Sequence, residues 1–139
     1  MSDKCFPYHG QCLCGAIRYR VAAFSPHMAH CHCSMCRKFH GAAFATFGEV
    51  QKADFQWIQG QDALAAYRAD NGTTRRFCRH CGSSMLFEPS QADGSVIEIA
   101  LGTLDTPIPQ HPDAHIYLDN KADWYSPCDG LPLYPAGRE

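Results

Sequence analysis

Short stretches in which apolar and polar residues alternate recur along the chain. Across residues 16–21, Ile17, Tyr19 and Val21 alternate with two arginines, the period of two that is typical of a half-buried strand. Many short strands at roughly even spacing predict a mainly β domain built of antiparallel sheets. Further apolar or β-branched runs that we interpret as strands lie at residues 42–47, 73–77, 84–88, 96–101 and 116–118.

Two segments favour helix instead. Residues 34–40 begin with Ser34, a residue type that caps helix N-termini, and are followed by Gly41, which suits a helix C-terminus. Residues 61–69 are rich in alanine and leucine and favour a helix on propensity alone. Prolines at positions 107, 109, 112, 127, 132 and 135 predict an extended, irregular carboxyl-terminal segment, because proline interrupts helices and central strands.

Composition narrows the class of protein. The chain has 139 residues, 45% of them hydrophobic, and we expect one domain spanning residues 1–139 with its core at about 10–132. The formal net charge is −2 and there is no basic stripe, which argues against nucleic acid as a partner. Residues 1–6 lack the apolar run of a secretory signal, and no stretch approaches the roughly 18 apolar residues of a membrane span. We therefore expect a soluble, cytoplasmic protein.

The nine cysteines change this picture most. An odd number cannot form a complete set of disulfides within one chain, and cytosolic thiols stay reduced. Seven of the nine fall into three tight clusters, which indicates metal binding, although buried free thiols are the simpler alternative. For the isolated Cys5 and Cys128, the free thiol is the favoured interpretation.

The first and third clusters are pairs that each end in glycine: Cys12-Leu13-Cys14-Gly15 and Cys78-Arg79-His80-Cys81-Gly82. Two thiolates separated by one or two residues can reach the same tetrahedral zinc ion. A glycine directly after the second cysteine permits a positive φ, which lets the chain turn tightly around the metal. Because one pair supplies only two ligands, we expect the two pairs to combine in a closed four-thiolate structural zinc site.

The middle cluster places three thiols, Cys31, Cys33 and Cys36, within six residues. Three protein ligands with an open fourth position are typical of catalytic zinc. Such a centre can hold a substrate thiol as its thiolate, which is the nucleophilic form. The sequence therefore predicts a second zinc ion at this triad, held less tightly than the first.

Other arrangements remain open from spacing alone. One of His30, His32 and His40 could close the middle cluster as a structural site. The seven cysteines could also divide differently, for example with Cys31 and Cys33 joining the third cluster. His111 and His115 stand near Asp113, but isolated histidines more often form hydrogen bonds than bind metal.

Together these runs resemble a known family, the glutathione-dependent formaldehyde-activating enzymes, which also include centromere protein V. The resemblance extends from about residue 10 to residue 132. Its motifs occupy residues 10–19, 31–38, 77–82, 115–124 and 129–132.

The resemblance implies a tent-like fold of small antiparallel sheets, with strand rather than helix at residues 61–69. It also implies structural zinc at the outer pairs, and catalytic zinc at Cys31, Cys33 and Cys36. The implied reaction is that of a carbon–sulfur lyase, in which glutathione adds to formaldehyde to give S-hydroxymethylglutathione. The enzyme that names the family has a longer carboxyl-terminal region than this sequence, so the expected partner is a small thiol, of which glutathione is one example. The alternatives are a non-catalytic structural zinc module for protein interaction, and a zinc-buffering or redox-sensing protein.

Overall fold

The computed structural model describes residues 4–90 and 94–138, and these form ten strands, one α-helix and four 3-10 turns. The elements are β1 (Tyr8–Gln11), β2 (Arg18–Val21), β3 (Met28–Cys31), α1 (Ser34–His40), β4 (Ala45–Gln51), η1 (Lys52–Asp54), β5 (Phe55–Gln59), η2 (Gln61–Ala63), β6 (Leu64–Arg68), β7 (Thr74–Cys78), β8 (Ser84–Glu88), β9 (Val96–Ala100), η3 (Leu101–Thr103), β10 (His115–Ile116) and η4 (Leu118–Asn120).

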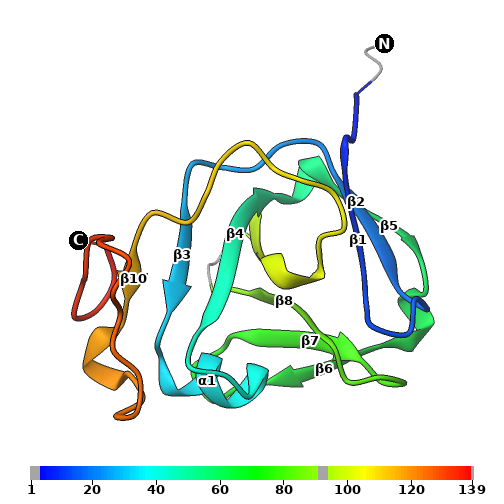
Figure 1. Ribbon diagram of the computed structural model, residues 1–139. Helices are drawn as coiled ribbons and strands as arrows, with labels where there is room; N and C mark the ends of the chain where they lie inside the picture. Colours follow the sequence, from blue (N-terminus) through cyan, green and yellow to red (C-terminus); the bar gives the residue numbers. More distant parts are fainter. Residues whose placement is uncertain (1–3, 91–93, 139) are drawn as a thin grey trace.

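The strands form two sheets that pack against each other (Figure 1). The small sheet has the order β1-β2-β5, and the large sheet has the order β10-β3-β4-β9-β8-β7-β6. All pairings are antiparallel except that of β10 with β3, which is parallel. The predicted mainly β class with small antiparallel sheets is therefore confirmed.

The main core lies between the two sheets. Ile17, Tyr19 and Val21, which the alternation pattern placed on one face, are almost fully buried against Val50 and Ile99 of the large sheet. Burying a side chain of this size contributes about 1.5–3 kcal/mol. The Tyr19 ring also stacks on Phe55, with ring centroids 5.4 Å apart.

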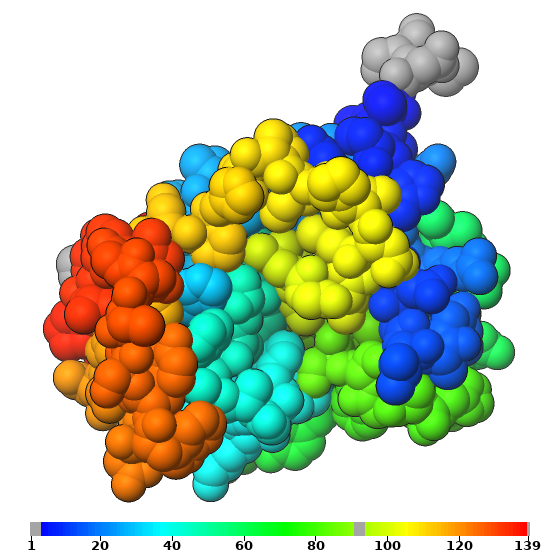
Figure 2. Space-filling model, in the orientation of Figure 1, coloured from blue at the N-terminus to red at the C-terminus, as the bar shows by residue number. Residues whose placement is uncertain are grey.

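A second, smaller cluster lies on the other face of the large sheet. Cys31, Cys36 and Ala45 are buried there with Phe47 and Ala100. The carboxyl-terminal segment, residues 114–138, packs beside α1 and β3 on this side (Figure 2). Its contacts bring residues from the end of the described chain next to the middle cysteine cluster.

Most of the predicted elements form, with shifted ends. The helix at 34–40 and the strand at 84–88 have the expected bounds, and Gly41 ends the helix in a left-handed conformation. The N-cap residue is Cys33 rather than Ser34, so that detail of the prediction was wrong. Residues 61–69 form a 3-10 turn and strand β6, as the family resemblance implied and in contrast to their helix propensity.

Among the described residues, no helix is long and apolar enough to cross a membrane.

Candidate functional site

The first and third cysteine clusters meet at two hairpin turns. Cys12 and Cys14 lie in the turn between β1 and β2, while Cys78 ends β7 and Cys81 lies in the turn before β8. The four Sγ atoms all lie within 4.8 Å of one another. Cys14 Sγ lies 3.6 Å from Cys12 Sγ and 3.8 Å from Cys78 Sγ. Sulfurs around a tetrahedral zinc ion at about 2.3 Å are separated by about 3.8 Å, so these residues fit such an ion.

The glycines after each pair adopt the predicted backbone. Gly15 has φ of 80° and Gly82 has φ of 79°, values that residues with a side chain rarely adopt. Each glycine N–H donates to a cysteine carbonyl, Gly15 to Cys12 at 3.1 Å and Gly82 to Cys78 at 2.8 Å. These bonds close the turns and direct the sulfurs toward a common centre.

Backbone N–H groups also point at the sulfurs. Ile17 N–H donates to Cys12 Sγ at 3.3 Å, and His80 N–H donates to Cys78 Sγ at 3.4 Å. Ser83 joins the two turns, because its Oγ accepts from the N–H of Leu13 at 2.8 Å. Donors of this kind stabilise thiolates. The pKa of Cys81 is lowered to about 5, whereas the Ala16 N–H is outweighed by burial and by the neighbouring sulfurs, which raise the pKa of Cys14 to about 11.

The middle cluster is placed at the junction of a strand and a helix. Cys31 ends β3, Cys33 is the N-cap of α1, and Cys36 lies in its first turn. Interactions with the Cys31 sulfur, with the Arg75 guanidinium and with Cys33 lower the pKa of Cys36 to about 6. Within the described part of the chain, the three sulfurs do not gather within 4.8 Å of one another as the other four do. A metal at this triad would therefore draw the side chains together.

Arg75 brings a permanent positive charge to the triad. It is buried, and its Nη2 donates to Cys36 Sγ at 3.6 Å. The guanidinium lies 5.5 Å from the ring centroid of Phe39 and 5.2 Å from that of Phe87. Its Nε and Nη1 have no hydrogen-bond partner among the described residues. Three thiolates on a divalent ion would carry a charge of −1, which this arginine would offset.

The three histidines near the triad differ in their hydrogen bonding: His30 and His32 each have a partner, whereas the buried His32 Nδ1 and His40 Nε2 have none among the described residues. His32 Nε2 is hydrogen-bonded to His115 Nδ1 at 2.8 Å, and His115 Nε2 lies 2.9 Å from an Asp129 carboxylate oxygen. His30 Nδ1 is hydrogen-bonded to Thr46 Oγ1 at 2.8 Å. His40 packs edge-on against Phe47, and burial lowers its pKa to about 4.

Cys78 and Cys81 are grouped with Cys12 and Cys14, not with Cys31 and Cys33, so the structure disfavours the alternative pairing. His115, which carried no firm role from its position in the sequence, is fully buried between β3 and Asp129. His111 remains exposed.

A cavity of about 730 Å³ opens beside the triad. Cys31 lines it together with Phe47, Phe87 and Tyr117. Tyr117 has φ of 60°, the one positive value in a non-glycine residue of the described chain. A residue held in this conformation costs roughly 1–3 kcal/mol and is characteristic of functional sites.

Sequence reasoning missed several of these groups. Arg75 follows a threonine in a predicted strand, and nothing local distinguishes it from its neighbour Arg76. Glu98 and Tyr117 reach the cavity only because β9 and the carboxyl-terminal segment lie beside β3 and β4. Tyr117 lies within residues 115–124, one of the runs that resemble the family, and this resemblance was the only sequence signal for it.

Comparison with known proteins agrees with this architecture. Residues 7–120 match the family model described as glutathione-dependent formaldehyde-activating enzyme. A Halomonas elongata protein named "Putative glutathione-dependent formaldehyde-activating enzyme" is 32% identical over 83% of this chain and 77% of its own length. A Schizosaccharomyces pombe protein named as an uncharacterized lyase is 30% identical over 58% of this chain and 56% of its own.

A crystal structure of a Rhodobacter sphaeroides protein shares the fold. It superimposes with a TM-score of 0.61 at 23% identity, over 73% of this chain and 91% of that one. The match of the family model over most of the sequence, with the 32% identical relative, is decisive: the chain belongs to the glutathione-dependent formaldehyde-activating enzyme family.

Proposed function

We propose that the protein is a zinc-dependent carbon–sulfur lyase that makes or breaks the adduct of a small thiol, such as glutathione, with formaldehyde. Cys12, Cys14, Cys78 and Cys81 hold a structural zinc ion in this proposal. Cys31, Cys33 and Cys36 hold the catalytic one. The family and the clusters of cysteines without disulfides both favour a cytoplasmic location, where thiols stay reduced.

The reaction forms or breaks one carbon–sulfur bond. In the forward direction the thiolate sulfur donates its electron pair to the formaldehyde carbon, and the carbonyl oxygen takes up a proton to become a hydroxyl. In the reverse direction the hydroxyl loses its proton and the sulfur leaves with the electron pair. A zinc ion at the triad would stabilise the sulfur as thiolate at neutral pH.

The surrounding residues have separate parts in this scheme. Arg75 offsets the negative charge of the three cysteine thiolates from the buried side of the sheet. His32, held by His115, fixes the backbone between Cys31 and Cys33. Phe47 and Phe87 pack against each other at 4.8 Å between centroids and give the cavity apolar walls.

One observation carries the proposal: Cys31 belongs both to the triad and to the wall of the 730 Å³ cavity. A ligand position left open by three cysteines would thus face a space large enough for a substrate. A purely structural metal site has no use for such access.

The first test measures thiol binding at the triad. In cobalt-substituted protein, glutathione should change the visible absorption spectrum, because a thiol that enters the open position adds a fourth sulfur ligand. Cys33→Ser should abolish this change while the protein stays folded and keeps its four-cysteine metal. Cys128→Ser, which removes an exposed cysteine outside the clusters, is the matched control and should behave as wild type.

A failure of this test has a definite meaning. If the fully loaded protein shows no spectral change with any of several small thiols, the lyase proposal is wrong. Four cysteine sulfurs lie close together at one site, whereas those of the triad do not. This difference would then favour a structural zinc module that binds another protein.

A further inference from the structure

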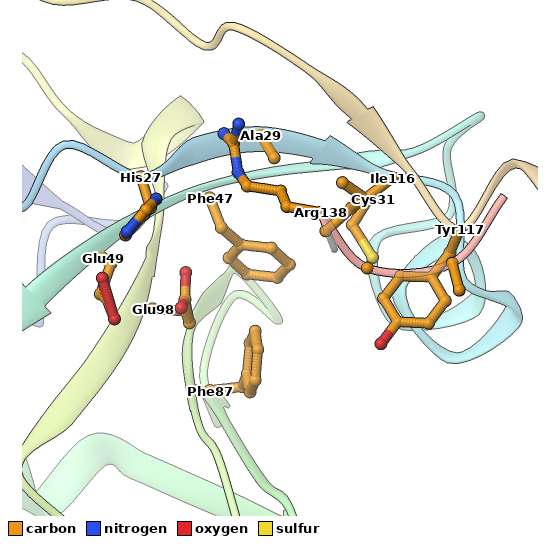
Figure 3. Close-up of a pocket in the computed structure, with 12 residues that line it drawn as sticks. His27, Ala29, Cys31, Phe47, Glu49, Phe87, Glu98, Ile116, Tyr117 and Arg138 are labelled. Carbon is orange, nitrogen blue, oxygen red and sulfur yellow. The ribbon is translucent and has the colours of Figure 1, made fainter. Parts of the chain in front are cut away.

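The two faces of strand β3 carry different groups. The side chain of Cys31 lies on the face that lines the cavity, together with the rings of Phe47 and Phe87 (Figure 3). Successive side chains of a strand point to opposite faces, so His30 lies on the face turned away from the cavity. A ligand site built on that second face is therefore separate from the cavity and from Cys31.

Three neighbouring strands place polar side chains in one row on this second face. His30 is in register with His115 of β10 on one side and with Thr46 of β4 on the other. The rings of the two histidines lie 4.8 Å apart between centroids. Asp129 reaches the row from the carboxyl-terminal segment, and its Oδ2 lies 2.9 Å from His115 Nε2. The register of the sheet thus brings two imidazoles and a carboxylate together from separate parts of the sequence.

The potential ligand atoms in this row lie close together. One ring nitrogen of each histidine and one carboxylate oxygen of Asp129 all lie within 4.8 Å of one another. Ligand atoms around a tetrahedral ion at about 2.0–2.1 Å are separated by about 3.4 Å. Asp129 is exposed and can adjust its position. Small side-chain rotations therefore suffice to bring the three atoms to the distances that a metal ion requires.

Each histidine has its other ring nitrogen engaged by a neighbouring side chain. His30 Nδ1 is hydrogen-bonded to Thr46 Oγ1 at 2.8 Å, and His115 Nδ1 is hydrogen-bonded to His32 Nε2 at 2.8 Å. The Nε2 atom of each ring is therefore the one available to a metal. Histidines that bind metals almost always form a hydrogen bond through the second nitrogen, which fixes the orientation of the ring. The row thus has the outer hydrogen bonds of a metal site as well as its ligands.

The surroundings of the row are apolar on one side and open on the other. Phe44 packs against both imidazoles, with its ring centroid 4.7 Å from that of His30 and 5.6 Å from that of His115. His115 is fully buried, whereas Asp129 keeps 44% of its side chain exposed. Among the described residues, no lysine or arginine forms an ion pair with Asp129. A cation would therefore meet a carboxylate whose charge is not already neutralised, and it would enter from the side of Asp129.

We infer that His30, His115 and Asp129 form a binding site for a divalent transition-metal ion, distinct from the seven clustered cysteines. Two imidazoles and a carboxylate are characteristic ligands of zinc, cobalt, nickel and iron(II), whereas magnesium and calcium prefer oxygen ligands. A simple hydrogen bond between His115 and Asp129 does not account for the second imidazole. The bound ion would connect the carboxyl-terminal segment to β3. The site requires neither a metal nor a thiol at the triad, so it goes beyond the proposed function.

The test titrates zinc into protein from which a mild chelator has removed the exchangeable metal. NMR signals of the imidazole rings report binding at this site residue by residue. The ring signals of His30 and His115 should shift together along one saturable curve, which gives the Kd. In crystals grown with zinc, anomalous scattering should place an ion within bonding distance of His30, His115 and Asp129.

Two variants and a control separate ligands from neighbours. Asp129→Asn removes a charged ligand at an exposed position and should weaken zinc binding by about a hundredfold or more. Thr46→Val keeps all three ligands but removes the hydrogen bond to His30 Nδ1, and should weaken binding by about ten- to hundredfold. Asp119→Asn, which removes an exposed carboxylate from the same segment, should bind zinc as wild type does.

The inference is wrong if zinc leaves the ring signals of both histidines unchanged. It is also wrong if Asp129→Asn keeps the wild-type Kd, because the shifts would then arise from zinc at the triad and reach His115 through His32. Unchanged amide signals of β2 in each variant show that the domain is folded. If small thiols fail to bind at the triad while zinc still binds at His30 and His115 and Asp129→Asn abolishes that binding, the proposed function is wrong and this metal site stands.

Discussion

Arg75 places a positive charge beside the cysteine triad that the spacing of the cysteines along the sequence does not predict. Seven of the cysteines stood out in the sequence because their tight clusters have a spacing that is typical of metal ligands. Arg75 comes from β7, nearly forty positions after Cys36, and its contact with that sulfur depends on sheet topology. The position of this guanidinium beside the triad could therefore not be predicted from the sequence.

Among single residues, we expect Cys81 to have a large effect on the thermal stability of the folded protein. Cys81→Ser removes one ligand from a closed site, and structural zinc contributes about 10–16 kcal/mol of apparent binding free energy in zinc-finger peptides. The variant should lose its tightly held zinc and either aggregate or melt at a much lower temperature. Calorimetry with metal analysis checks this, with Cys5→Ser, an exposed cysteine outside the clusters, as the control. Wild-type melting with full zinc content would contradict the assignment.

Among the elements, β3 was not predicted although it carries Cys31. Its four residues, Met28 to Cys31, show no alternation of apolar and polar side chains, because both faces are covered in the fold. β2 was predicted because its outer face bears arginines, so the alternation is visible. A strand covered on both faces leaves no periodic signal. The strand predicted at residues 116–118 forms as β10, which spans only His115–Ile116, and a 3-10 turn begins at Leu118.

Glu98 on β9 leads to a prediction about how the stability of the protein depends on pH. The pKa of Glu98 is about 8 in the folded protein and about 4.3 in an unfolded chain. Between these values the folded state binds more protons, so this group lowers stability as pH rises. Glu98→Gln should therefore become progressively more stable than wild type from pH 6 to pH 8, by at most about 1.4 kcal/mol per pH unit.

Urea unfolding of the metal-loaded proteins at several pH values measures this difference. Glu88→Gln is the matched control on the neighbouring strand, since Glu88 pairs with Arg76 at 2.8 Å. It should show no rising advantage over wild type. A Glu98→Gln curve parallel to that of wild type would show that Glu98 ionises normally.

On the scale of the whole molecule, the carboxyl-terminal segment connects Asp129 to the triad through two buried histidines. The chain of contacts runs from Asp129 to His115 and then to His32, between Cys31 and Cys33. Arg37 of α1 adds a second link, because its Nε donates to the Asn120 carbonyl at 3.1 Å. The segment therefore fixes both sides of the strand–helix junction.

Asp129→Asn should loosen this segment without unfolding the domain. Asp129 is exposed, and its contact with the buried His115 is a single hydrogen bond of 2.9 Å, which contributes about 0.5–1.5 kcal/mol to stability. The amides of His115 and Tyr134, which bond within the segment, should exchange hydrogen faster, while amides of β2 stay protected. Hydrogen exchange measured residue by residue tests this. Unchanged exchange at both amides would show that the His115–Asp129 contact does not hold the segment in place.

The two hairpin turns that meet at the four cysteines also bear on how the chain folds. Cys14 and Cys78 are 64 positions apart in sequence, yet their sulfurs lie 3.8 Å from each other. Bringing such distant positions together costs loop-closure entropy before any sheet contact offsets it, and contacts of high sequence separation slow folding. An ion bound by both turns in the unfolded ensemble shortens the path between β2 and β7 along the chain. If the four cysteines bind zinc as proposed, the supply of metal during synthesis determines the folding rate as well as the final stability.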